Sequence, residues 1–149
     1  MYCNRGTSGI DGSTSTAIGN SLENKTPVLL VTGDLSFFYD MNALWNKYIR
    51  ADFRIIIINN GGGGIFKILP GHRENAIFSE FIETKHNLSA RNIAKMFNCN
   101  YNNVSTKFGL KLALGTFFRK SKKPKILEIK TSGIKSAKIL KDYFRYLSK

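Results

Sequence analysis

Apolar residues follow two different patterns along this chain. Residues 28–32 and 54–58 form short, continuous apolar runs, and four consecutive isoleucines occupy the second. Such runs predict strands, and unbroken β-branched residues are typical of a strand buried on both faces of a sheet. In residues 37–47, by contrast, the large apolar side chains recur every three to four positions, which predicts a helix.

The same two patterns alternate over the whole length of the sequence. Strands are predicted at 28–32, 54–58, 99–101 and 125–130. Helices are predicted at 13–22, 37–47, 89–97, 106–118 and 134–147, with a long loop at 61–70 and helical turns at 76–81. This alternation is typical of an α/β fold with a mainly parallel sheet. We therefore expect residues 1–149 to form one domain, a three-layer sandwich with helices on both faces of the sheet.

Two of the predicted strands end in polar residues and glycines. Gly33 and Asp34 follow the first strand, and Asn59, Asn60 and a run of four glycines follow the second. Because the carboxyl ends of neighbouring parallel strands meet at one edge of a sheet, we expect these groups to lie together.

The residue types at this edge suit a divalent cation that holds a phosphate. The carboxylate of Asp34, the side-chain amide of Asn60 and the backbone carbonyl of Gly62 supply hard oxygen ligands, which Mg²⁺ takes together with phosphate oxygens. Glycine also lets backbone N–H groups approach an anion closely. The sequence therefore predicts a metal–diphosphate site.

Composition narrows the possible functions. The net charge of +13 fits nucleic acid or small anionic ligands, but the chain has no aromatic–basic RNA-binding signature and no zinc-finger spacing. No apolar run approaches the roughly 20 residues of a membrane span. Two cysteines are too few for a disulfide framework, which favours the cytoplasm. His72 and His86 stand alone in polar surroundings, and we expect both to be surface residues.

The strand-end residues resemble a known family. Gly33-Asp34 followed later by Asn59-Asn60 resembles the metal–diphosphate motif of thiamine-diphosphate-dependent enzymes, although Leu35 replaces a glycine that many of them carry. Within that superfamily, residues 4–12, 33–44 and 59–70 resemble the menaquinone-pathway family MenD, 2-succinyl-5-enolpyruvyl-6-hydroxy-3-cyclohexene-1-carboxylate synthase. The resemblance is close over residues 2–70 and extends over the remainder as a general layout.

The resemblance implies a thiamine-diphosphate-binding fold and a role for each matched residue. Mg²⁺, or Mn²⁺ in its place, would be bound by Asp34, Asn60 and Gly62. Thiamine diphosphate would contact Ser8, Gly9, Ile10, Gly33, Asp34, Leu35, Ser36, Asn60, Gly62 and Ile65. Substrate would contact Arg5, through a carboxylate, and an apolar wall formed by Ile65, Phe66 and Leu69.

The resemblance also implies a reaction, in which decarboxylated 2-oxoglutarate is joined to isochorismate by a transferase that forms a carbon–carbon bond. The chain would be the C-terminal part of a longer multidomain enzyme, a homodimer or homotetramer in the cytoplasm. The glutamate that activates the cofactor would lie in a missing upstream domain, and a second subunit would complete the site. We therefore expect this chain to hold no catalytic residue and to be inactive alone.

Three alternatives remain open at this point. The chain could serve another thiamine-diphosphate decarboxylase or ligase, which activity on pyruvate would favour. It could be a stand-alone phosphate- or nucleotide-binding module, which calorimetry with nucleotides would favour. A basic nucleic-acid-binding domain has only the charge to support it and predicts binding that weakens steeply with salt.

Overall fold

The computed structural model describes residues 2–3, 9–69 and 75–148. Its strands form one fully parallel sheet with the order β1-β2-β4-β3. The strands are β1 (Leu29–Gly33), β2 (Arg54–Asn59), β3 (Asn100–Val104) and β4 (Lys125–Lys130). The parallel α/β sheet predicted from the alternating pattern is confirmed, and each predicted strand is present with its ends shifted by a few residues at most.

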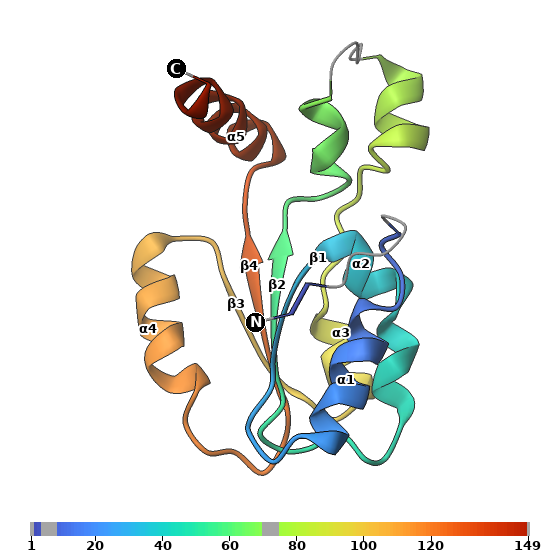
Figure 1. Ribbon diagram of the computed structural model, residues 1–149, viewed down its shortest axis with the longest axis vertical. Coiled ribbons are helices and arrows are strands. Elements are labelled where there is room, and N and C mark those ends of the chain that lie inside the picture. The colour runs from blue at the N-terminus through green and yellow to red at the C-terminus, as the bar shows by residue number, and fades with distance from the viewer. Residues whose placement is uncertain (1, 4–8, 70–74, 149) are drawn as a thin grey trace.

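Helices lie on both faces of this sheet, as expected (Figure 1). One face is covered by α1 (Ser13–Glu23), α2 (Asp34–Tyr39) and α3 (Arg91–Met96), and the other by α4 (Lys107–Phe117). Beyond the carboxyl ends of the strands lie α5 (Gly133–Leu147), the 3₁₀ helix η2 (Gly64–Lys67) and the π-helix η3 (Phe78–Ile82). A further 3₁₀ helix, η1, spans Met41–Trp45.

Alternate residues of the strands build two separate cores. Ile55 and Ile57 of β2 are fully buried and pack with Phe37 of α2 on one face of the sheet. On the other face, Leu127 of β4 packs with Phe117 of α4. The period of two along each strand therefore divides the apolar residues between the two helical layers.

The expectation that β2 is buried on both faces is only half right. Ile56 is half-buried beneath α4, while Ile58 remains 36% exposed and Val31 of the neighbouring β1 is 59% exposed. The reason is that α4 packs mainly over β3 and β4, so it covers the same face of β2 only in part and leaves that of β1 open.

The helix predicted at 37–47 is interrupted at Asp40, which leaves the helical conformation with φ −124° and ψ 22°. Its buried carboxylate accepts a hydrogen bond of 2.7 Å from the backbone N–H of Ser15, in the first turn of α1. A carboxylate is favourable there because the first N–H groups of a helix have no partner within the helix. Asp40 thus anchors α1, and the predicted helix is divided into α2 and η1 at this residue.

Glu128 of β4 is a fully buried carboxylate. It accepts hydrogen bonds from the side chains of Asn59 (2.6 Å), Ser89 (3.0 Å) and Tyr101, and from the backbone N–H of Ala90 (3.1 Å). Burial by itself would raise the pKa of Glu128, but these hydrogen bonds outweigh it and hold the pKa below its usual value. The residue ties β2, β3 and the start of α3 to β4.

No helix in the described part of the chain is long and apolar enough to cross a membrane.

Candidate metal and diphosphate site

Asp34 links the ends of β1 and β2. Its buried carboxylate accepts hydrogen bonds at Oδ2 from the backbone N–H groups of Gly61 (2.8 Å) and Gly62 (3.1 Å), and at Oδ1 from that of Leu35 (2.9 Å). The structure therefore brings Asp34 together with the glycine run, at the carboxyl edge of the parallel sheet where ligands of such folds bind.

The two asparagines after β2 point in different directions. Asn59 is buried, and its amide donates to Glu128 and to the carbonyl of Leu88 (3.0 Å). In Asn60, by contrast, the buried side-chain oxygen Oδ1 has no hydrogen-bond partner. A buried acceptor without a partner is unfavourable, and a cation beside Asp34 would satisfy it. Asn60 thus fits the predicted ligand role, while Asn59 belongs to the buried network around Glu128.

The glycine run is packed so tightly that side chains are excluded. Gly62 has φ +149°, and a Cβ there would lie 2.8 Å from the carbonyl oxygen of Glu83. The N–H of Gly63 donates to that same carbonyl (2.6 Å), and the carbonyl of Gly62 accepts from Gly64 (2.9 Å). Because a carbonyl oxygen has two lone pairs, that of Gly62 keeps one for a cation. Asp34, Asn60 and Gly62 therefore fit a divalent ion as a set of oxygen donors.

The turn before α1 lies beside this set. The hydroxyl of Ser36 donates to the carbonyl of Ile10 and shares a hydrogen bond of 2.7 Å with the hydroxyl of Ser13. Ile10 is 44% exposed, so its side chain is accessible at this edge. Of the other residues expected to contact cofactor, Gly9 and Gly33 are exposed and Leu35 is half-buried. Arg5, Ser8 and also His72 lie outside the described residues.

The predicted apolar wall begins directly after the glycine run. Ile65, Phe66 and Leu69 are 57%, 37% and 47% exposed. A Cβ at Gly63 would lie 3.0 Å from the ring of Phe66, so this ring packs on the glycine backbone. The three apolar side chains are therefore accessible, and Phe66 among them lies directly against the glycine run.

The expectation that His86 is a surface residue is wrong. Its side chain is only 10% exposed, and Nε2 lies 3.3 Å from Oδ2 of Asp34. The residues from Glu83 to His86 fold back against the glycine run, so the ring is enclosed between that loop and Phe38. Sequence reasoning missed this neighbour because an isolated histidine in a polar stretch carries no spacing signal.

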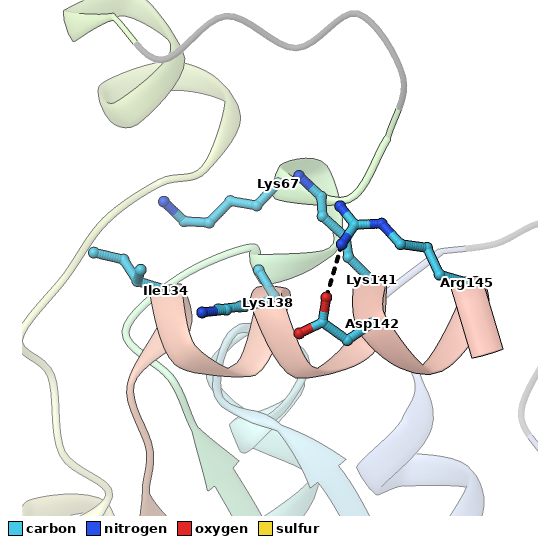
Figure 2. Close-up of a pocket in the computed structure, with 7 residues that line it drawn as sticks. Lys67, Ile134, Lys138, Lys141, Asp142 and Arg145 are labelled. Atoms are coloured by element: carbon cyan, nitrogen blue, oxygen red, sulfur yellow. Dashed lines mark hydrogen bonds and ion pairs between the residues drawn. The ribbon is translucent and has the colours of Figure 1, made fainter.

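Basic side chains line a pocket beside the same loops. A pocket of about 260 Å³ lies between α5 and η2 and is lined by Lys67, Ile134, Ala137, Lys138, Lys141, Asp142 and Arg145. Figure 2 shows that Lys141 and Arg145 rise from α5 on the side that faces Lys67. Arg145 is paired with Asp142 (2.9 Å) and Lys67 with the buried Glu83 (3.1 Å).

A second pocket, of about 390 Å³, connects this region to the candidate ligands, because Asn60, His86 and Lys67 all line it. No group of three or more His, Cys, Asp or Glu side chains able to hold a metal occurs in the described ranges. The candidate set does not depend on such a group, since it combines one carboxylate with an amide and a backbone carbonyl.

Comparison with known proteins gives a consistent picture. Residues 2–129 match the family model described as "Thiamine pyrophosphate enzyme, C-terminal TPP binding domain". The chain is 50% identical over 147 residues to the 2-succinyl-5-enolpyruvyl-6-hydroxy-3-cyclohexene-1-carboxylate synthase of Christiangramia forsetii, and 49% identical over 148 residues to that of Flavobacterium johnsoniae. Each match covers 99% of this chain but only 26% and 27% of the relative. The chain thus spans about a quarter of the length of these curated relatives.

Solved structures support the fold. A thiamin diphosphate-dependent enzyme from Mycobacterium smegmatis, described as putative, superposes with a TM-score of 0.54 at 22% identity, over 80% of this chain and 21% of that one. A 4-hydroxybenzoylformate decarboxylase from Rhodococcus jostii superposes with a TM-score of 0.50 at 24% identity, over 78% and 22%.

Proposed function

The chain belongs to the family of C-terminal TPP-binding domains of thiamine pyrophosphate enzymes, and on that basis we propose that it is the diphosphate- and metal-binding part of a synthase that joins decarboxylated 2-oxoglutarate to isochorismate in menaquinone biosynthesis. The observation that carries this proposal is a buried Asn60 oxygen without a partner, directly before the glycine run that binds the Asp34 carboxylate. The choice of reaction is supported by the similarity to the two synthases.

Each candidate residue has a physical task in this proposal. Asp34, Asn60 and Gly62 hold Mg²⁺ or Mn²⁺ through oxygen atoms, and the glycine run brings its N–H groups close to the diphosphate. When bound, thiamine diphosphate supplies the electron sink for decarboxylation.

The substrate-facing residues do different work. Ile65, Phe66 and Leu69 exclude water from the reacting carbons, and Arg5 pairs with a substrate carboxylate, for which its planar fork of donors is suited. The basic pocket beside α5 adds a positive field that attracts anionic substrates.

The proposal also covers the rest of the assembly. Apolar side chains of α5, including Ile139 and Phe144, are exposed, as is Val31 on the open face of the sheet. Large apolar side chains exposed together on one element mark places where other protein packs. We therefore propose that further domains with the activating glutamate, and a second subunit, complete the site in a cytoplasmic homodimer or homotetramer. The chain alone is expected to be inactive.

Replacement of the carboxylate tests the site. In the complete enzyme, Asp34→Ala removes the charged ligand, and binding of thiamine diphosphate in the presence of Mg²⁺ should fall below detection in titration calorimetry. Asp52→Ala is a matched control, because Asp52 is a partly exposed carboxylate paired with Arg50, before the amino end of β2. Unchanged cofactor affinity in Asp34→Ala would exclude Asp34 from the site.

A further inference from the structure

His86 contacts the candidate site in two ways. Its backbone N–H donates to the carbonyl of Gly61 (3.1 Å), and its imidazole lies 3.3 Å from Asp34. The ring is also packed edge-on against Phe38 of α2, with the ring centroids 5.5 Å apart and an angle of 83° between the planes. The orientation of the imidazole is therefore determined by its packing.

One hydrogen bond to the ring identifies the nitrogen that carries the proton. Nδ1 accepts a hydrogen bond of 3.1 Å from the backbone N–H of Leu88. A neutral imidazole has one acceptor and one donor nitrogen, so Nε2 carries the hydrogen. Nε2 is buried and lies 3.3 Å from Oδ2 of Asp34, but it has no aligned hydrogen-bond partner. The imidazole therefore acts on this carboxylate through close contact at 3.3 Å, without an aligned hydrogen bond.

This contact makes the two oxygens of Asp34 unequal. Oδ2 accepts from Gly61 and Gly62 and also faces His86, whereas Oδ1 accepts only from Leu35. Because each carboxylate oxygen has two lone-pair sites, Oδ1 retains capacity for a cation while Oδ2 is held by the surrounding groups.

We propose that His86 is a positioning residue of the metal site. Its ring orients the carboxylate of Asp34, and its backbone N–H holds Gly61, so that Asn60 and the glycine run keep the geometry required for ligation. Groups that orient the ligands of a metal in this way affect its affinity without touching it. The inference rests on the function proposed above, which makes Asp34 a metal ligand.

A matched pair of variants of the complete enzyme tests this role. Glutamine and methionine have similar length and shape, but only glutamine offers an N–H to Asp34. We expect His86→Met to weaken Mn²⁺ binding in the presence of thiamine diphosphate by roughly 10- to 100-fold, and His86→Gln to restore most of the affinity. Electron paramagnetic resonance of free Mn²⁺ measures the affinity directly, without any assay of activity.

The possible results separate the two proposals. Asn87→Ala, a change in the exposed neighbouring residue, should bind Mn²⁺ like the wild type. If His86→Met binds like the wild type, or if the two His86 variants lose the same affinity, the side chain acts only by filling space and the inference fails. If the wild type itself does not bind Mn²⁺ with thiamine diphosphate, the proposed function fails and the inference fails with it.

Discussion

Gly62 has a backbone conformation that side chains rarely adopt. With φ at +149° and Glu83 packed against it, Gly62→Ala should lower the free energy of unfolding of the enzyme by about 1–3 kcal/mol and weaken cofactor binding. Urea denaturation and calorimetry measure the two effects.

Gly115 provides the control for that substitution. It lies within α4, where an added Cβ meets nothing within 4 Å, so Gly115→Ala should stabilise the protein by about 0.5–1 kcal/mol. Equal stability in the two variants would contradict the tight packing of the glycine run against Glu83.

At the scale of residues, the sequence identified the candidate ligands that directly follow a strand, because their position in the chain places them at the edge of the sheet. Asp34 and Asn60 follow β1 and β2 directly, and the structure brings their loops together. The roles of Asn59, Glu83 and His86 were not predicted, because they depend on partners far away in the sequence. The carboxylate that holds Asn59, for example, belongs to Glu128.

At the scale of elements, the buried Glu128 joins three strands and a helix. Its carboxylate has a lower pKa in the folded chain, so its contribution to stability is complete above the unfolded pKa, near 4.3, and declines as the pH falls through the folded value. Glu128→Gln should therefore lower the free energy of unfolding by about 1.5–3 kcal/mol at pH 7, with the difference from wild type shrinking in acid. Denaturation at several pH values between 7 and 3 measures this difference.

The matched control at this scale is Glu23→Gln. Glu23 is exposed at the end of α1, so its replacement should leave stability nearly unchanged at every pH. A loss in Glu128→Gln that did not depend on pH would show that the shape of the network matters more than the charge.

The predicted boundaries of an element were accurate where neighbouring residues alone determine them, and inaccurate where a distant contact does. Helix α5 and strand β4 match the predicted ranges within a residue, because their patterns are continuous. The helix predicted at 37–47 is broken at Asp40, since the carboxylate bonds to α1 across the chain. The helical turns predicted at 76–81 include a π-helix at Phe78–Ile82. The apolar pattern of this short segment did not distinguish a π-helix from an α-helix.

At the scale of the whole molecule, α5 leaves much of its apolar side uncovered by the rest of the chain. Its polar side faces η2, while Ile139, Tyr143, Phe144 and Leu147 are each more than half exposed. Phe144→Glu should lower the melting temperature of the complete enzyme and shift it toward smaller species in sedimentation, because a charge would enter an apolar contact.

A substitution at an exposed polar position of α5 gives the comparison. Lys135→Glu introduces the same side chain at an exposed position and should leave both measurements close to wild type. Wild-type behaviour of Phe144→Glu would mean that this surface of α5 faces solvent in the assembled protein.

The sequence by itself determined the α/β class, the order of the elements and the chemistry at the ends of β1 and β2, because these follow from periodicity and from residues adjacent in the chain. Only the tertiary structure decided that α4 leaves half of one sheet face open, that Asn59 turns inward to Glu128, and that His86 lies against Asp34. These outcomes depend on which surfaces meet once the helices pack on the sheet. Contacts between residues distant in the sequence are selected by burial and hydrogen bonding in three dimensions, and no local pattern records them.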